Sequence, residues 1–279
     1  MIVFRKMKPE DITAGLSLCR SAGWNQLARD WEIFLKLSPS GCHVAGLEKI
    51  VGTVTTVRYQ NHFSWIGMLL VDPSKQRQGI GMQLMREALH FLQHEDTIKL
   101  DATPAGREVY LKLNFVDEYP LSRMMIKAVP NNLKASGTRP ILKCDLSSIM
   151  KFDHEVFGAD RQTLLEWMLE GAPQNAFLVE EKNEIQGYCF GRPGYNLTQI
   201  GPVIAKNTEI AKKLVSSALQ NLIGHPVVMD VPYCDPLWSE WLKSVGFTEQ
   251  RPFIRMYLGS NDFTGIVEKQ FAIMGPEFG

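Results

Sequence analysis

The most informative segment of this chain reads Leu69-Leu70-Val71-Asp72-Pro73-Ser74-Lys75-Gln76-Arg77-Gln78-Gly79-Ile80-Gly81-Met82. Residues 65–71 are an apolar run typical of a buried strand, and Pro73 marks the turn that ends it. After the glycines, apolar residues recur at the three- and four-residue spacing of an amphipathic helix: Ile80, Leu84, Met85, Ala88, Leu89 and Leu92. The chain is therefore predicted to run from a strand through a glycine loop into a helix N-terminus.

Such a loop suits a phosphate group. A helix N-terminus presents backbone N–H groups that have no intrahelical acceptor, together with the positive end of the helix dipole. Gly79 and Gly81 have no side chain to block the approach of a pyrophosphate, and Arg77 adds positive charge. The segment is not a Walker loop, because no Gly-Lys-Ser/Thr follows, and it lacks the third glycine of the dinucleotide fingerprint.

The segment closely resembles the acyl-CoA loop of the GNAT acyltransferase superfamily. That loop reads Leu-x-Val-x-Pro, two residues, then Gln/Arg-x-x-Gly-x-Gly/Ala, and every position is filled here. The resemblance implies that acetyl-CoA is the cosubstrate and that the strand end bonds its pantetheine arm like an added strand. The implied contact residues are Leu69, Leu70, Val71, Gln76, Arg77, Gln78, Gly79, Ile80, Gly81 and Met82.

Tyr110 is the candidate catalytic residue. It opens the segment 110–115, which resembles the Tyr-x-Lys-x-Gly-Phe segment whose tyrosine acts as general acid in many GNAT enzymes. A phenol with a reference pKa of about 10 is protonated at neutral pH and can donate to a departing thiolate. Asn114 stands where the family usually has glycine, but asparagine tolerates the left-handed conformation that such a helix end needs. The alternative is a tyrosine that only packs at a helix end.

No general base can be assigned from the sequence. Many GNAT enzymes carry a glutamate on the strand before the loop, but residues 62–71 contain no carboxylate. The base could come from the second half of the chain, from a water chain, or from Asp30, Glu32, His43, Tyr59 or His62. Asp153 and His154, in the segment 152–161, are candidates for the substrate pocket only, because a charged helix start capped by Asp160 explains them equally well.

The first part of the chain alternates elements in the order of a GNAT domain. Strands are expected at 2–7, 65–71 and 97–100, a hairpin at 43–47 and 50–59, and helices at 9–22, 26–37, 80–92 and 104–113. Residues 115–117 and 121–127 are expected to close the sheet. The predicted fold class is α/β, an α+β type of mixed sheet.

The remainder of the chain repeats this pattern weakly. Residues 110–115 reappear as 241–247 with one residue inserted, and Arg123-Met124 reappears as Arg255-Met256. We therefore predict two tandem GNAT-type domains: an acetyl-CoA-binding domain at 1–128, a linker at 129–140, and a degenerate domain at 141–279 that shapes or caps the acceptor pocket. Residues 205–211 lack the glycines, and Glu209 would compete with a phosphate, so the second copy is not expected to bind CoA. Its tail, residues 271–279, is similar to that of a bacterial subgroup of tandem GNAT proteins.

Composition narrows the class of partner and compartment. The 279 residues carry 30 basic and 30 acidic side chains, so no nucleic-acid or membrane partner is expected. The five cysteines are dispersed without a CxxC pair, which favours free buried thiols in a reducing compartment and no metal site: Cys19, Cys42, Cys144, Cys189 and Cys234. The charged N-terminus and the lack of an apolar run of about 20 residues favour a cytoplasmic protein. The expected oligomeric state is a monomer or a homodimer.

The leading hypothesis is an acetyl-CoA-dependent N-acetyltransferase that acts on a primary amine of a small molecule by direct attack in a ternary complex. A tandem build favours an enclosed pocket over an open groove. Two alternatives remain open at this point. One is a protein N-terminal or lysine acetyltransferase, since the loop carries no information on the acceptor, and the other is a non-catalytic acyl-CoA sensor, since the strand carboxylate is missing.

Overall fold

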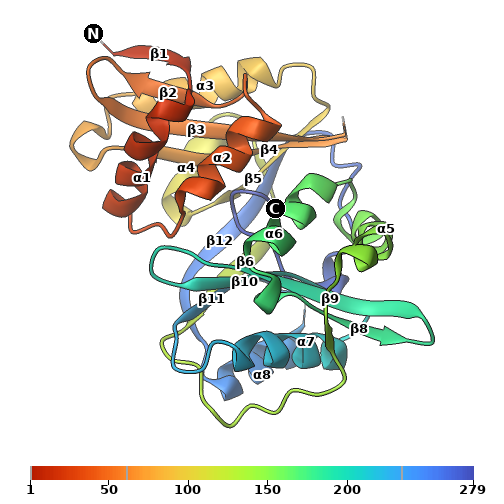
Figure 1. Ribbon diagram of the computed structural model, residues 1–279. Coiled ribbons are helices and arrows are strands. Elements are labelled where there is room, and N and C mark those ends of the chain that lie inside the picture. Colours follow the sequence, from red (N-terminus) through yellow and green to blue (C-terminus); the bar gives the residue numbers. More distant parts are fainter. Residues whose placement is uncertain (1, 61, 234) are drawn as a thin grey trace.

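The computed structural model describes residues 2–60, 62–233 and 235–279, shown in Figure 1. The first half contains β1 (Val3–Lys6), α1 (Ile12–Ser21), α2 (Ala28–Leu37), β2 (His43–Gly46), β3 (Ile50–Tyr59), β4 (Phe63–Val71), α3 (Ile80–Phe91), β5 (Thr97–Ala102), α4 (Pro104–Leu111) and β6 (Val116–Ile126). These are the expected elements, with their ends shifted by a few residues. The two short strands expected at 115–127 are one continuous strand, β6.

The second half repeats the order. It contains β7 (Arg139–Pro140), α5 (Leu146–Phe157), α6 (Gln162–Gly171), β8 (Phe177–Glu181), β9 (Glu184–Arg192), β10 (Thr198–Ala205), α7 (Thr208–Gln220), β11 (Val227–Pro232), α8 (Pro236–Val245), β12 (Thr248–Gly259) and β13 (Gln270–Ala272). Short 3₁₀ turns precede or join several of these elements. The repetition agrees with the sequence similarity between the two halves.

One mixed sheet runs through both halves. Over the described residues it has thirteen strands in the order β1-β2-β3-β4-β5-β12-β6-β11-β10-β9-β8-β7, with β13 attached to β10. The pairs β4–β5 and β10–β11 are parallel and the other pairs are antiparallel. The predicted fold class, a mixed α/β sheet, is confirmed, and the two halves have the same order of elements.

The two halves exchange their last long strands. β12 lies beside β5, with Ile254 opposite Ala102, and β6 lies beside β11, with Met124 opposite Met229. Residues 115–117 and 121–127 are expected from the sequence to close the sheet of the first half, but β12 of the second half takes the place beside β5, and β6 pairs with β12 and β11. An apolar pattern fixes which face of a strand is buried but leaves open which strand is its neighbour.

The halves also share a core. α1 and α2 cover the face of the first half that is seen in Figure 1, and their buried side chains join those of α5 and α6 in one cluster. α3 and α4 pack on the opposite face of the first half, and α7 and α8 pack against the second half. Because one apolar cluster contains residues of both halves, we expect the halves to stabilise each other.

The C-terminal tail is the element that joins the halves most closely, and it lies between them in Figure 1. The Phe278 ring is fully buried and stacks on the Phe34 ring at 4.6 Å. The Tyr59 hydroxyl donates a 2.6 Å hydrogen bond to the Phe278 carbonyl, and the Trp65 indole donates a 2.9 Å bond to the Pro276 carbonyl. A segment of the second half is thus built into the core of the first.

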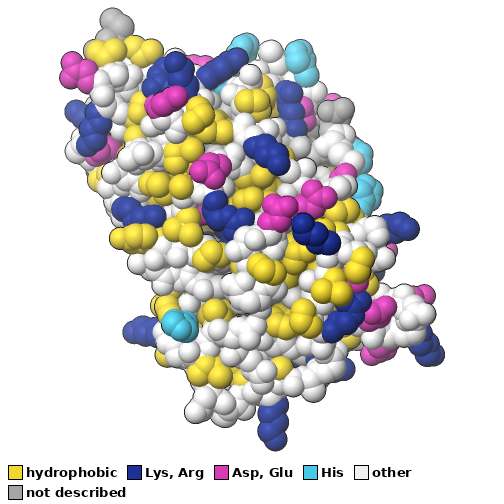
Figure 2. Space-filling view, viewed as in Figure 1, with side chains coloured by type: hydrophobic (Ala, Val, Ile, Leu, Met, Phe, Trp, Pro, Cys, Tyr) yellow, Lys and Arg dark blue, Asp and Glu magenta, His cyan; other side chains and the backbone are white. Residues whose placement is uncertain are grey.

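The surface and the thiols show a few further features. On the face drawn in Figure 2, basic and acidic side chains are interspersed. Within the described ranges, no helix is long and apolar enough to cross a membrane, and no group of His, Cys, Asp and Glu is placed to hold a metal ion. Cys19, Cys42 and Cys189 are buried free thiols, whereas Cys144 is exposed, contrary to expectation. Cys234 lies outside the described residues.

Candidate active site

A cavity opens where β4 and β5 separate. The two strands pair only at Ser64–Ile98 and Trp65–Lys99, and beyond these pairs β4 bends, with Met68 at φ +49°. On its other side β4 is held to β3, where the Thr53 hydroxyl donates a 2.9 Å bond to the Met68 carbonyl. The backbone of β4 after Trp65 therefore faces a gap instead of a neighbouring strand.

Both halves of the chain line this cavity, which has an empty volume of about 660 Å³ including its open mouth. β4 contributes one wall, which includes Leu69, and β5 contributes another. Tyr110 of α4 contributes to a third. The second half contributes Arg251 of β12 and Glu277 of the tail. The tail lies directly against β4, because a Cβ atom on Gly67 would come within 2.9 Å of the Glu277 carbonyl oxygen.

The glycine loop leads from the edge of this cavity into α3. The Gln76 side-chain amide donates a 3.3 Å bond to the Val71 carbonyl, and Arg77 adopts φ +60°. Gly79 is the N-cap residue at φ +79°, a left-handed conformation that favours glycine. A Cβ atom on Gly79 would meet nothing within 4 Å, so the space beside the loop is open.

The N-terminus of α3 is free to accept an anion. The first intrahelical bond runs from the Gln83 N–H to the Gly79 carbonyl, so the preceding amides of Ile80, Gly81 and Met82 have no acceptor within the helix. Within α3 as described, no side chain caps the N-terminus and the first turn holds no acidic residue. These amides and the helix dipole suit a pyrophosphate.

The corresponding helix of the second half is already capped. The Asn207 side chain accepts a 3.0 Å bond from the Ile210 N–H at the start of α7, and Glu209 lies in the first turn. Both features satisfy the positive helix end from within the protein. The two halves therefore differ at the position where the first presents free amides.

Other residues of the predicted CoA set lie at different depths around the loop. Leu69 lines the cavity, whereas Leu70 is buried on the other side of β4 in the shared core. Ile80 is buried, and Arg77 and Gln78 are exposed. The structure thus gathers this set along one strand edge and one helix end, with Leu70 and Ile80 anchoring the two elements by packing.

Tyr110 lies in the cavity wall near the end of α4. Its ring packs beside Gly106 and lies 5.9 Å from the Phe115 ring. Burial raises the pKa of Tyr110 to about 12, so the phenol keeps its proton throughout the neutral range. Asn114 adopts φ +64°, which confirms the left-handed conformation expected at this helix end.

None of the five single residues considered as a base lies in the wall that the described residues form around the cavity. Asp30 is ion-paired with Arg192, and Tyr59 is committed to the tail carbonyl. His62 lies 4.4 Å from a phenylalanine ring and contacts a backbone carbonyl. His43 is buried in β2, where burial lowers its pKa, and Glu32 is on the exposed side of α2.

The segment 152–161 is not part of the cavity lining either. The buried Asp153 carboxylate receives three hydrogen bonds from Arg161, between 2.8 and 3.2 Å, and another from the Tyr188 hydroxyl. Neither Asp153 nor His154 lines the cavity, and Asp153 ties α5 to the segment before α6 and to β9. The contacts of Asp153 are those of a structural ion pair, and a role of this segment in the substrate pocket stays a prediction.

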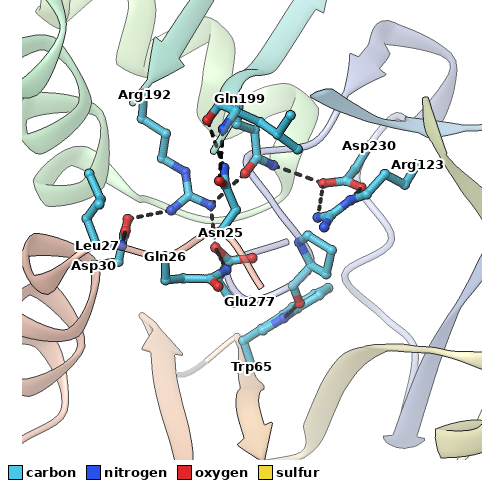
Figure 3. A network of polar contacts seen from close by, with 12 residues as sticks. Asn25, Gln26, Leu27, Asp30, Trp65, Arg123, Arg192, Gln199, Asp230 and Glu277 are labelled. Carbon is cyan, nitrogen blue, oxygen red and sulfur yellow. Dashed lines mark hydrogen bonds and ion pairs between the residues drawn. The ribbon is translucent and has the colours of Figure 1, made fainter. Parts of the chain in front are cut away.

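Sequence reasoning missed the charged network under the cavity, which Figure 3 shows. Arg192 of β9 binds both Asp30 and Glu277, and the Gln26 amide donates a 3.0 Å bond to Glu277. Burial on its own would raise the pKa of Glu277, but Arg192 and Gln26 outweigh that effect and hold it below its usual range. Glu277 is therefore ionised at neutral pH.

Two further ion pairs hold the central strands together. Arg123 of β6 makes a bidentate pair with Asp230 of β11 at 2.7 and 2.8 Å. Arg255 of β12 makes another with Asp101 of β5 at 2.9 and 3.0 Å. Burial raises the pKa of Asp101, although Arg255 opposes this effect. An arginine in the middle of an apolar strand is a signal for such a pair, because a buried charge requires a partner.

Comparison with known proteins identifies the family. Residues 11–115 match the model described as the acetyltransferase (GNAT) family, and residues 149–272 match the model described as an acetyltransferase (GNAT) domain. Among curated proteins, the chain is similar to the holothin acyltransferase of Pseudoalteromonas sp. (strain SANK 73390), with 26% identity over 85% of this chain and 81% of the relative. It is also similar to the N-acetyltransferase YitH of Bacillus subtilis (strain 168), with 23% identity over 90% of each.

Solved structures support the same family assignment. A putative acetyltransferase from Pyrococcus horikoshii superposes with a TM-score of 0.84 and 26% identity, over 100% of this chain and 96% of that one. A tandem GNAT protein from the clavulanic acid biosynthesis pathway shares the fold, with a TM-score of 0.65 and 13% identity over 94% of this chain and 100% of that one. The chain therefore belongs to the GNAT superfamily and is an N-acyltransferase that carries two GNAT domains in tandem.

Proposed function

We propose that this protein transfers an acetyl group from acetyl-CoA to a primary amine of a small molecule, by direct attack in a ternary complex. One observation carries the proposal. A single cavity adjoins the free strand edge of β4, contains Tyr110, and is closed by residues of the second half. Acyl transfer needs a thioester held in place, an amine beside it, and a proton for the departing thiolate, and this cavity offers a place for each.

The first half supplies the acyl-CoA contacts. The amides at the start of α3, with Arg77, would bind the pyrophosphate, and the backbone of residues 69–71 would bond the pantetheine arm as an added strand. The unpaired backbone of β4 supports this assignment, because such groups need a partner when they are covered. Loop residues 76–82 then hold the nucleotide end while the thioester lies at the cavity.

Tyr110 would protonate the leaving group. The amine nitrogen attacks the thioester carbonyl carbon, the carbon–sulfur bond breaks, and the thiolate takes the phenolic proton. The attacking nitrogen releases one proton to solvent and the Tyr110 phenolate takes one proton from solvent, so the net products are the amide and the free thiol. A pKa of about 12 keeps the phenol in the donating form at neutral pH.

The shape of the site favours a small acceptor. The tail residues Pro276 and Glu277 line the cavity from the side of the second half, and a pocket with walls from both halves suits a small molecule better than a polypeptide. The holothin acyltransferase relative, whose name gives it a small-molecule acceptor, supports the same choice. The presence of Tyr110 in the cavity wall disfavours a sensor without catalytic activity.

The test is a panel of amines, amino acids, polyamines, aminoglycosides and short peptides, assayed with acetyl-CoA for release of free CoA. Turnover of small amines is expected. Turnover restricted to peptides would favour a protein acetyltransferase, and tight CoA binding with no turnover on any class would favour a sensor. Replacing acetyl-CoA with longer acyl-CoAs in the same assay determines the acyl preference.

A charge change in the loop should separate the two halves. We expect calorimetric titration to give one acetyl-CoA site per chain, and Gly81→Glu to weaken its affinity by roughly 10- to 30-fold. The variant places a carboxylate at the second residue of α3, the position that Glu209 holds in α7. It thereby reproduces in the first half the arrangement that we expect to prevent binding in the second.

Two control variants isolate the charge. A Cβ atom on Gly81 would lie 3.5 Å from Val71, an ordinary contact, so Gly81→Ala should fold and bind normally. Gly81→Gln adds the same bulk as glutamate without its charge and should bind more tightly than Gly81→Glu. Two binding sites per chain, or equal affinities of the Glu and Gln variants, would contradict the proposed use of this helix end.

A further inference from the structure

Arg251 is the unusual cation of the cavity. It projects from β12 into the cavity wall, and no carboxylate in the described part of the chain lies within ion-pair distance of its guanidinium. Its Nε atom is buried and has no hydrogen-bond partner among the described residues. Its one recorded ring contact is with Phe253, at 4.9 Å from the ring centroid. A buried N–H donor without an acceptor costs free energy, which a bound anion would recover.

The two neighbouring arginines, unlike Arg251, have carboxylate partners. Arg123 stands directly opposite Arg251 in the β6–β12 ladder, and its charge is matched by the bidentate pair with Asp230. Arg255, four residues further along β12, is matched by Asp101. Of these three arginines, only Arg251 has no carboxylate partner of its own among the described residues. It also lies opposite another arginine, and like charges opposite each other in a sheet are unfavourable.

Arg251 nevertheless carries its charge at neutral pH. Burial lowers the pKa of its guanidinium to about 10, and Arg123 acts in the same direction, whereas the carboxylates of Asp230 and Glu277 act against this shift from beyond ion-pair distance. The cavity therefore offers a positive charge that no ion pair holds among the described residues, in a fork-shaped group with several donors. A carboxylate fits this group in both charge and geometry, because it carries one negative charge and accepts two parallel hydrogen bonds.

The position of Arg251 separates it from the pyrophosphate site. The glycine loop continues from the far end of β4, whereas Arg251 lies on β12, two strands away in the sheet order. Another wall of the same cavity carries the ionised Glu277, which attracts a cation. An acceptor with an ammonium group and a carboxylate would satisfy both walls.

We propose that Arg251 binds a carboxylate of the acceptor, so that the acceptor is an amino acid or a similar amino carboxylate. This inference rests on the proposed function, since it assumes that the cavity holds the acceptor. The other source of the same chemistry is a carboxylate on the acyl group, as in a dicarboxylic acyl-CoA. The two sources predict different results.

The kinetic test compares acceptors in matched pairs. The twenty protein amino acids, β-alanine and γ-aminobutyrate are each assayed beside the amine that lacks the carboxylate. For the preferred acceptor, we expect the carboxylate to raise kcat/KM by about 10- to 100-fold in the unchanged protein. Arg251→Gln should reduce this ratio to near one, and Arg251→Lys should restore part of it, because lysine keeps the charge without the fork.

Controls distinguish this from loss of folding. Arg5→Gln removes an arginine on edge strand β1 that pairs with Asp11, and it should leave the ratio unchanged. Acetyl-CoA affinity of the Arg251 variants, measured by calorimetry, should match that of the unchanged protein. A ratio that Arg251→Gln does not alter, or a variant that instead loses turnover of succinyl-CoA relative to acetyl-CoA, would overturn the proposal.

A binding measurement keeps the test independent of turnover. In the presence of CoA, N-acetylated amino acids should bind more tightly than the corresponding N-alkylacetamides, and Arg251→Gln should abolish the difference. If no amine is turned over but this difference is found, the carboxylate site stands and the proposed enzyme function fails. If amines are turned over without any preference for a carboxylate, in kinetics or in binding, the function stands and this inference fails.

Discussion

Replacing Tyr110 with phenylalanine is expected to lower kcat by about 10²- to 10⁴-fold, the range typical for loss of a general acid. The phenol lies in the cavity wall, and no hydrogen bond ties it to another residue in the described part of the chain, so its proton is available to a leaving thiolate. The ring itself packs beside Gly106 and Phe115, and phenylalanine preserves those contacts. Affinity for acetyl-CoA should therefore stay close to that of the unchanged protein.

The matched control is Tyr195→Phe. Tyr195 is 58% exposed and lies outside the cavity, where its ring packs on Arg20, a contact that phenylalanine keeps. Steady-state kinetics with an acceptor from the amine panel should show a loss for Tyr110→Phe only. A kcat within a factor of about two of the unchanged protein would mean that another group or solvent protonates the thiolate.

The pH profile provides a second measurement of the same role. Tyr110 acts in its protonated form, and its pKa is raised to about 12, so its activity is present at low and neutral pH and is lost as the pH rises through 12. Between about pH 7 and 10, deprotonation of Tyr110 should therefore cause no fall in kcat. A fall in that range that disappears in Tyr110→Phe would show an ordinary tyrosine pKa instead.

The loop and its chemistry could be predicted from sequence because they are local. Gly79 and Asn114 occupy left-handed conformations that few residues tolerate, so their identities report the backbone directly. The strand, loop and helix around residues 69–82 are contiguous, and their periodicity fixes their type. A family pattern of this kind depends on neighbours in the chain.

The rest of the site could not be predicted because it depends on contacts between distant parts of the chain. Glu277 reaches the cavity only because the tail passes between the halves, and it meets Gln26 across 251 positions of sequence. Arg251 reaches it because β12 is exchanged into the first sheet. Neither the exchange nor the path of the tail leaves a local pattern, since both are decided by which surfaces pack together in three dimensions.

Arg192→Met is expected to lower the free energy of unfolding by roughly 3–5 kcal/mol, the cost of leaving buried charges without their partner. The Arg192 side chain is 4% exposed and binds two carboxylates, Asp30 and Glu277, whose side chains are 2% and 4% exposed. Methionine fills part of the space but leaves both acids unpaired. Urea denaturation followed by tryptophan fluorescence measures the loss.

A surface pair provides the control. Arg107 and Asp117 are bonded with a shortest distance of 2.6 Å, but their side chains are 34% and 39% exposed. Removing a solvated pair of this kind costs about 0–1 kcal/mol, so Arg107→Met should unfold nearly like the unchanged protein. If Arg107→Met and Arg192→Met lowered the free energy of unfolding equally, burial of the Arg192 ion pairs could not explain the effect.

The dependence of the Arg192→Met loss on pH identifies its cause. Burial already raises the pKa of Asp30 in the unchanged protein, although Arg192 opposes it, whereas the pKa of Glu277 is lowered. Without the guanidinium, burial should raise the pKa of Asp30 further and that of Glu277 above its value in the unfolded chain. Unfolding then lets the acids ionise, so the penalty is full at pH 7 and shrinks as the pH falls toward about 4, where the unfolded acids also hold their protons. Neutralising both acids in the same chain, with Asp30→Asn and Glu277→Gln, should recover much of the stability at pH 7. A loss that is the same at pH 4.5 and 7, and that the triple variant does not recover, would mean that packing of the Arg192 side chain stabilises the junction of the two halves, and not its charge.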